Sequence, residues 1–508
     1  MANTNLGAAK AAKNDEFYTQ YHDIEREVNA YIEYDPDVFR GKTILLPCDD
    51  PEWSNFTKYF AQNFDRFGLK RLISTSYAPE SKRYKNWEPT LFETEDPKYD
   101  VDMSKTHGKI FILDWDKTGD GRIDVNDLRW EYMEGDGDFR SDEVKRLRDE
   151  ADFIITNPPF SLFREFLSWI VEAGKQFLVI GNMNAITYKE VFPLIKENKM
   201  WLGATGNGTD MVFAVPKGTE VKEEDRQKAA RLGYVGDYTR LGNSCWFSSI
   251  DHGKRHNPLP LMTMADNIKF SRHKEIRGHG YQHYDNYDAI EVPYTDAIPS
   301  DYEECLGVPV SFLDKYCPEQ FEILGSEKQN DGIRTKIYPE QIQVDKKGNR
   351  ERVTKLNDGA ALRVPDGKIP DGETYYIVDG KIYTQVYKRL FIRAITPPLN
   401  EMSINDLRDF VVSAFGFTAE EVSICSGVMG VPISFLDKYC PEQFEILGMC
   451  ENMDLYGLKT RVYTTDECRK AYFDKFGKNG TYDLNASGVV IENNLYEKVY
   501  QRILIRKI

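Results

Sequence analysis

The stretch ADFIITNPPFSLFREFL, Ala151–Leu167, decides the fold class, because it passes from a strand through a rigid turn into a helix. The residues before Asn157 read as a buried strand, because ADFIIT (Ala151–Thr156) is mostly apolar and rich in β-branched residues, as in strands buried on both faces. Asn157-Pro158-Pro159 ends this strand, since proline cannot donate to a ladder and has a fixed φ. The residues that follow repeat their apolar side chains at helical spacing.

Strand and helix patterns alternate along the chain up to about residue 215. Strands that alternate with helices predict an α/β fold with a mainly parallel twisted sheet covered on both faces. In such sheets the ligand lies at the carboxyl ends of the strands, where both NPPF and PCDD (Pro47–Asp50) occur. Strands are predicted in Lys42–Asp50, Lys70–Tyr77, Gly108–Trp115, DFIITNPP (Asp152–Pro159) and Gln176–Ile186.

Composition places the chain among multidomain globular proteins. It has 508 residues, of which 41% are hydrophobic and 13% aromatic. The eight cysteines form no CxxC pair and no ligand spacing with histidine, so we interpret them as reduced thiols and predict no metal site. The N-terminal residues lack the apolar core of a signal peptide, and no apolar run could span a membrane. We therefore expect a cytoplasmic protein that does not bind membranes.

The formal net charge of −16 argues against a simple nucleic-acid binder, but the charge is unevenly distributed. Five of the seven histidines lie between His252 and His283, within a locally basic segment. Such a segment predicts a phosphate-contacting surface, and a solvated loop is the alternative. The candidate cations are Lys254, Arg255, Arg272, Lys274 and Arg277.

The C-terminal third contains an internal duplication. VPVSFLDKYCPEQFEILG (Val308–Gly325) recurs at Val431–Gly448, and the sequence of Tyr383–Ile395 recurs at Tyr496–Ile508. We interpret this as two copies of one α+β module of roughly 80 to 90 residues. Two copies are too few for a solenoid. The predicted domains are a catalytic domain (1–300), module copy 1 (301–396), a linker with a helix near 404–416 (397–429), and module copy 2 (430–508).

The NPPF motif itself suits a particular chemistry. The Asn157 side-chain oxygen and the Pro158 carbonyl are two acceptors on a stiff loop, and an exocyclic amine offers two N–H donors. Gripping both hydrogens leaves the nitrogen able to attack an electrophile. Phe160 offers a flat face for a planar ring. The motif therefore predicts activation of an amino group on a flat substrate, whereas a simple strand-ending turn is the alternative.

Beyond NPPF, several ordered motifs make the chain resemble N6-adenine DNA methyltransferases of the EcoRI modification-methylase type. These are KNDEFYT (Lys13–Thr19), GDGDFRSDEV (Gly135–Val144), RLGNSCWFSSIDHGKRHNPLPL (Arg240–Leu261) and VPYTDAIPSDYE (Val292–Glu303). The resemblance implies a Rossmann-like class I methyltransferase domain, S-adenosylmethionine as methyl donor, and a C-terminal region that recognises the target. It covers residues 13–395 and the second module copy.

The resemblance also implies roles for individual residues. Asn157, Pro158 and Pro159 would hold the adenine N6, and Phe160 would stack on the flipped base. The methyl donor would be contacted by Phe17, Tyr18, Thr19, Pro47, Cys48, Asp49, Asp138 and Phe139. The chain departs from the family pattern at two places in the donor site. PCDDPEWSNF has no glycine where the family's loop is usually glycine-rich, and no acid directly follows the strand ending in ISTSY, where a carboxylate often holds the ribose. The residue that would hold the donor's ribose is therefore unassigned.

DKTGDGRIDVND (Asp116–Asp127) matches several positions of a calcium-binding loop. However, position 12 is Asp127 where glutamate is usual, and the preceding residues predict a strand instead of an entering helix. We favour an acidic surface turn and keep calcium as the alternative.

Together with the motif chemistry, the resemblance implies methylation of adenine N6 in a short specific sequence of double-stranded DNA, with base flipping and without a required metal. One alternative is an amino-methyltransferase acting on RNA or protein glutamine. Another is a non-catalytic DNA-binding protein that keeps a methyltransferase fold. A separate restriction endonuclease could accompany the chain, and the sequence does not indicate whether it is a monomer or a dimer.

Overall fold

The computed structural model describes most of the chain up to residue 395 and parts of the remainder. These are residues 17–47, 54–78, 94, 96–205, 211–215, 221–386, 388–395, 408, 411–412, 423–425, 428–438, 444–449, 463–481, 484, 488–492, 495–499 and 502–507. Cys48, Asp49 and most of the predicted helix near 404–416 lie outside them. Among these residues no helix has the length and apolarity needed to cross a membrane.

Contacts divide the chain into two compact units. Unit 1 comprises Met1–His256 with Val310–Lys315, and unit 2 comprises Asn257–Pro309 with Tyr316–Ile508. The boundary falls at His256, whereas the predicted catalytic domain extends to residue 300.

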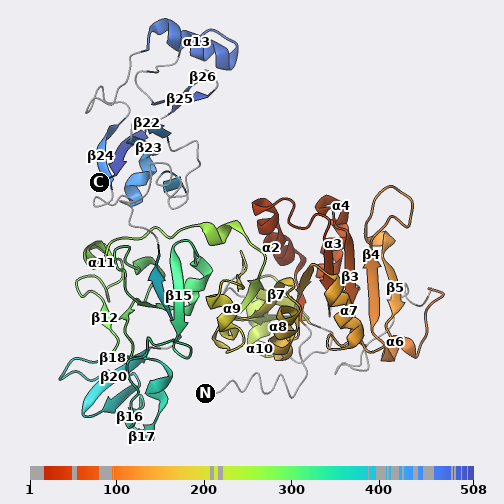
Figure 1. Ribbon diagram of the computed structural model, residues 1–508, viewed down its shortest axis with the longest axis horizontal. Helices are drawn as coiled ribbons and strands as arrows, with labels where there is room; N and C mark the ends of the chain where they lie inside the picture. Colours follow the sequence, from red (N-terminus) through yellow and green to blue (C-terminus); the bar gives the residue numbers. More distant parts are fainter. Residues whose placement is uncertain are drawn as a thin grey trace. The chain divides into compact units, whose positions relative to one another are not determined.

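Unit 1 alternates helices and strands (Figure 1). Its elements are β1 Tyr18–Thr19, α2 Tyr21–Tyr34, β2 Thr43–Leu46, α3 Asn55–Gln62, α4 Phe64–Phe67, β3 Arg71–Thr75, α6 Met103–Thr106, β4 Lys109–Leu113, η2 Val125–Asp127, β5 Arg129–Tyr132, α7 Asp142–Glu150, β6 Phe153–Thr156, η3 Phe160–Leu162, α8 Phe163–Glu172, β7 Gln176–Asn182, η4 Met183–Thr187, α9 Phe192–Lys196, β8 Trp201–Leu202, β9 Met211–Ala214, α10 Glu223–Arg231, β10 Tyr238–Leu241, β11 Ser244–Ser248, η5 Gly253–His256 and η7 Val310–Lys315.

The main sheet has eight strands in the order β5-β4-β3-β2-β6-β7-β11-β8. Parallel pairing is confined to β3-β2-β6-β7 at its centre. The prediction of a mainly parallel sheet is therefore wrong for the flanks, where β4, β5, β11 and β8 pair antiparallel to their neighbours. A parallel return needs a long crossover, usually helical. The described part of the β3–β4 connection contains only the short α6.

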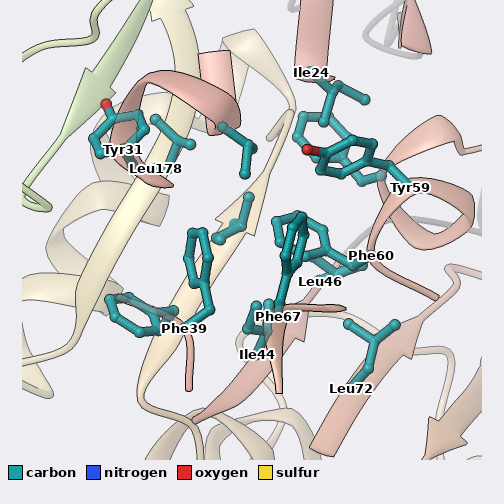
Figure 2. Packing of buried hydrophobic residues seen from close by; sticks show 14 of the residues in the cluster. Ile24, Tyr31, Phe39, Ile44, Leu46, Tyr59, Phe60, Phe67, Leu72 and Leu178 are labelled. Atoms are coloured by element: carbon teal, nitrogen blue, oxygen red, sulfur yellow. The ribbon is translucent and has the colours of Figure 1, made fainter. Parts of the chain in front are cut away.

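Both faces of the sheet are covered, as the apolar runs predict. Alternate strand residues such as Ile44, Leu46 and Leu178 pack against aromatic side chains from α2, α3 and α4 (Figure 2). The intervening residues, such as Leu45 and Val179, are equally buried on the opposite face. The central strands are therefore buried on both faces.

Unit 2 is built mainly from antiparallel strands. Its elements are α11 Met264–Phe270, β12 Gln282–His283, β13 Ile290–Glu291, η6 Thr295–Ala297, β14 Leu306–Pro309, β15 Phe321–Ser326, β16 Gln341–Val344, β17 Arg350–Val353, η8 Lys355–Asp358, β18 Ala360–Arg363, β19 Tyr375–Val378, β20 Lys381–Val386, β21 Arg389–Ala394, β22 Ser423–Cys425, β23 Val428–Pro432, η10 Ile433–Lys438, β24 Phe444–Met449, α13 Thr465–Phe476, β25 Gly488–Glu492, β26 Leu495–Val499 and β27 Arg502–Lys507.

The repeated sequences occupy matching strands. In the first repeat β21 lies between β14 and β15, and in the second β27 lies between β23 and β24. The registers agree residue for residue: Val308 pairs with Leu390 as Val431 pairs with Ile503. Both repeats also have a register shift at the corresponding place in β15 and β24. The connections differ, because β16–β20 lie within the first repeat and α13, β25 and β26 within the second.

A buried carboxyl gives unit 2 a specific pH dependence. Burial raises the pKa of Glu327 to about 7. The backbone N–H of Lys388, which donates to Oε2 at 3.0 Å, lowers this pKa but does not cancel the effect of burial. Since the ordinary value is 4.5, the folded chain binds more protons than the unfolded chain from about pH 4.5 to pH 7. The free energy of unfolding should therefore fall as pH rises through this window and level off above it.

We expect Glu327→Gln to remove this slope, so that its stability relative to the parent chain rises by about 1–3 kcal/mol between pH 5 and pH 8. Urea unfolding at several pH values, followed by a probe in unit 2, measures the difference. The matched control is Glu340→Gln, which changes an exposed glutamate in the same unit. A pH-independent difference for Glu327→Gln would contradict the prediction.

Candidate active site

The NPPF turn lies where the central parallel strands end. β6 ends at Thr156, and its hydroxyl donates to the backbone carbonyl of Pro47, just beyond the end of β2, at 2.7 Å. Two strand ends more than a hundred residues apart in sequence are thereby joined. The prediction that NPPF and the start of PCDD share one edge of the sheet is confirmed for Pro47, whereas Cys48 and Asp49 lie outside the described residues.

Asn157 presents an unused acceptor. Its Nδ2 donates to the backbone carbonyl of Phe17 at 2.6 Å, and because a carbonyl can only accept, this contact fixes which end of the amide is which. The other end, Oδ1, is buried, and no described residue hydrogen-bonds to it. A buried acceptor without a donor costs about 1–3 kcal/mol, a cost that an N–H from a bound molecule would remove.

The two prolines and the following helix hold this amide in place. Pro158 is buried, and the Pro159 carbonyl accepts from Leu162 N at 2.9 Å as η3 begins. The turn therefore passes directly into η3 and α8, and its backbone has little freedom.

Three phenylalanine rings surround the turn. Phe160 stacks on Phe17 with ring centroids 5.6 Å apart and an interplanar angle of 27°. Phe213 meets both rings edge-on, at 6.0 Å from Phe17 and 6.3 Å from Phe160. The predicted residues Phe17 and Phe160 are thus brought together. Phe213 was not predicted, because MVFAV indicates only a strand and its partner is far away in sequence.

A small sheet positions the FYT motif. β1, which contains Tyr18 and Thr19, pairs antiparallel with β9, and β9 also pairs with β10. The Asn55 side chain donates to the Thr19 carbonyl at 2.8 Å and ties β1 to the start of α3. The motif near the N-terminus is consequently held beside Asn157.

The GDGDF loop packs against the end of β3. The Ala78 amide donates to the Asp136 carbonyl at 2.8 Å. Asp138 pairs with Arg140, whose hydrogen bonds lower the pKa of this carboxyl. Phe139 is buried, with its ring against Phe166 and Trp169. The loop therefore lies at the predicted edge of the sheet, but Phe139 packs in the core and its ring offers no open face to a ligand.

Gly137 allows this close packing because it has no side chain. Its φ is +83°, and a Cβ at this position would lie 2.2 Å from the Ser76 carbonyl oxygen. We expect Gly137→Ala to lower the free energy of unfolding by about 2–4 kcal/mol, because both the left-handed backbone and the contact oppose a side chain. Thermal melting measures the loss. Gly135→Ala in the same loop is the control, since a Cβ there would meet nothing within 4 Å. Equal melting temperatures for the two variants would contradict the prediction.

The five predicted phosphate-contacting cations lie in different environments. Arg255 is only 7% exposed, pairs with Asp251 and stacks on Trp201 at 3.6 Å, so it cannot reach a phosphate, and we do not retain it as a DNA contact. Lys254 pairs with Asp314 at 2.7 Å. In unit 2, Arg272 pairs with Asp296 but is exposed, as are Lys274 and Arg277.

The Asp116–Asp127 turn uses its carboxylates internally. Asp116 accepts the amides of Gly119 and Gly121, and Asp127 accepts those of Lys117, Thr118 and Asp124. In the part of the chain that the structure describes, no group of three or more His, Cys, Asp or Glu side chains is arranged to hold a metal ion. The hydrogen bonds of Asp116 and Asp127 fit an acidic surface turn, and the absence of calcium stays a prediction.

Comparison with known proteins adds the family. The model of the family described as adenine-specific methyltransferase EcoRI matches residues 5–364 and 421–508. The chain belongs to this family. Membership confirms the resemblance predicted from the motifs, and it makes the chain a site-specific DNA methyltransferase that acts on adenine.

Curated relatives agree with this assignment. The type II methyltransferase M.EcoRI of Escherichia coli is 41% identical over 325 residues, which are 64% of this chain and 89% of the relative. The type II methyltransferases M.MpnI of Mycoplasma pneumoniae and M.MgeORF184P of Mycoplasma genitalium are each 32% identical, over 62% of this chain and 83% and 84% of their own lengths. No solved structure matches the chain significantly.

Proposed function

We propose that this methyltransferase transfers a methyl group from S-adenosylmethionine to N6 of an adenine flipped out of duplex DNA. The observation that carries the proposal is the buried Asn157 Oδ1, which has no donor among the described residues although the same amide is fixed through Nδ2. A flat substrate with an exocyclic amine satisfies this oxygen. The cost of unstacking the base, a few kcal/mol, is offset by the pocket.

The pocket residues act on the target amine. Asn157 Oδ1 and the Pro158 carbonyl accept its two hydrogens, so that the nitrogen lone pair points away from both. The ring of Phe160 stacks on the base, a contact worth about 1–3 kcal/mol. Because Phe17 and Phe213 support that ring, the plane of the base is set by three aromatic side chains.

The methyl donor is assigned to the neighbouring strand ends. The FYT strand, Pro47 and the GDGDF loop meet at the carboxyl ends of β2, β3 and β6, the edge at which ligands bind in such sheets. S-adenosylmethionine supplies an already activated methyl group, so the chain itself needs to position the amine and exclude water. The assigned donor contacts are Phe17, Tyr18, Thr19, Pro47, Cys48, Asp49 and Asp138.

Target recognition is assigned to unit 2. Its exposed cations Arg272, Lys274 and Arg277 are proposed to contact phosphates, and its two repeats to read bases in a short sequence. A separate endonuclease of the same specificity remains a prediction.

The test is expression of the chain in a host without adenine methylation, followed by base-resolution mapping of N6-methyladenine. We expect the mark at every copy of one or more short motifs. If the protein is soluble and binds S-adenosylmethionine in calorimetry but no mark appears, DNA adenine is not the substrate. If the donor does not bind, the donor site is wrongly assigned.

A further inference from the structure

One connection of the first repeat belongs to the catalytic unit. Val310–Lys315, η7, joins β14 to β15, which are strands of unit 2, yet its contacts place it in unit 1. Leu313 is only 7% exposed. Asp314 pairs with Lys254 of η5 at 2.7 Å, and η7 contacts β8. We call η7 the first anchor, and the surface formed by β8 and Lys254 the acceptor.

The acceptor is a surface that needs a cover. β8 lies at the end of the eight-stranded sheet, and an exposed edge strand invites unwanted pairing. The nearby Asp314 also contributes to the raised pKa of Cys245 on β11, whose main cause is burial. The first anchor therefore both covers this end of the sheet and places a charge close to it.

The second repeat contains nearly the same sequence, with two of its apolar side chains exposed. Ile433–Lys438, η10, reads ISFLDK where η7 reads VSFLDK. Leu436, which corresponds to Leu313, is 50% exposed, and Ile433 is 36% exposed. These two residues are three apart in a 3₁₀ helix, so their side chains lie on one face. Phe435, by contrast, is buried against Phe444 within its own repeat. The exposed apolar side chains of this segment are therefore Ile433 and Leu436.

We propose that Ile433–Lys438 is a second anchor for the same acceptor. Within one chain, the two anchors would occupy this acceptor alternately. The matching sequence gives the second anchor the leucine and aspartate that the first anchor uses. Because the strand registers of the two repeats match, these residues follow equivalent strands in both repeats. The residues between Ala394 and Ser423 would reach at most roughly 90 Å if fully extended, which sets the limit for docking within one chain.

The exchange would decide which repeat works with the catalytic unit. Because the inserted elements of the two repeats differ, each docked state would present a different surface to DNA. This consequence rests on the proposed function, whereas the docking itself requires neither methyl donor nor DNA.

Disulfide trapping tests the docking directly in the full-length chain. Lys254→Cys with Asp314→Cys is the positive control, because the two parent side chains are in contact. Lys254→Cys with Asp437→Cys tests the second anchor, and each single variant controls for the native cysteines. The samples are oxidised at low protein concentration, and cross-linked peptides are identified by mass spectrometry.

We expect a 254–437 cross-link within one chain, with a yield that rises at least several-fold when Leu313→Asp frees the acceptor and is lost with Leu436→Asp. The proposal is overturned if the 254–314 pair cross-links and the 254–437 pair does not, in both the parent and Leu313→Asp backgrounds. It is also overturned if the 254–437 cross-link forms only between two chains. Since no reaction is needed, either result is independent of whether the chain methylates adenine.

Discussion

Asn157→Ala is expected to lower kcat for adenine methylation by on the order of 10³-fold while the protein stays folded. The substitution removes the buried oxygen that has no donor in the described structure, and with it one of the two acceptors that would hold the target amine. It also removes the hydrogen bond from Nδ2 to the Phe17 carbonyl. The amine would then be held on one side only, and its lone pair would no longer be aligned with the methyl group.

Single-turnover methylation of a duplex that contains the mapped motif measures this effect, with donor binding measured separately by calorimetry. Asn157→Asp is the informative companion. It keeps an oxygen at the position of Oδ1 but sets its second oxygen against the Phe17 carbonyl, so we expect a large loss here as well. Asn126→Ala, an exposed asparagine in the acidic turn, should behave like the parent. Near-parental rates for Asn157→Ala would exclude NPPF from the chemistry.

The parts of this site that are local in sequence could be predicted from sequence. The run before Asn157 is apolar without alternation, which indicates a strand buried on both faces, and the prolines show where it ends. Parallel strands then place NPPF and Pro47 at one edge, as the Thr156–Pro47 hydrogen bond confirms. This inference needs only the periodicity of the sequence and the direction of the strands.

The parts that depend on distant partners could not be predicted. The direction of β4 depends on how the chain returns after β3. The apolar pattern of GKIFILDW is compatible with a parallel or an antiparallel strand, and the structure shows it antiparallel to β3. Arg255 looks like an available cation in sequence, but Trp201 and Asp251 enclose it. Phe213 becomes part of the aromatic cluster only because β9 pairs with β1. Each of these facts is a tertiary contact that no local pattern encodes.

Glu27→Ala is expected to have the second large effect, although Glu27 lies in α2 and touches none of the proposed substrates. Its carboxylate is fully buried and accepts from the amides of Ala204 and Thr205, at 2.8 and 2.7 Å, and from the Tyr31 hydroxyl at 3.0 Å. Burial raises the pKa of this carboxyl. Alanine would leave two backbone amides without an acceptor, which costs about 1–3 kcal/mol each.

The loss should reach the active site because these amides follow β8 on the way to β9. β9 pairs with the FYT strand and contains Phe213, whose ring contacts Phe17 and Phe160. We therefore expect Glu27→Ala to lower the free energy of unfolding by about 2–4 kcal/mol and to reduce kcat about 10-fold or more at temperatures where it remains folded. A purely structural role would lower the melting temperature and leave kcat of the folded protein unchanged. Glu25→Ala, an exposed glutamate on the same helix, is the matched control, and Glu27→Gln should restore part of both losses because it keeps one acceptor for these amides. If the folded Glu27→Ala protein methylates DNA at the parental rate, the β8–β9 connection does not position the pocket rings.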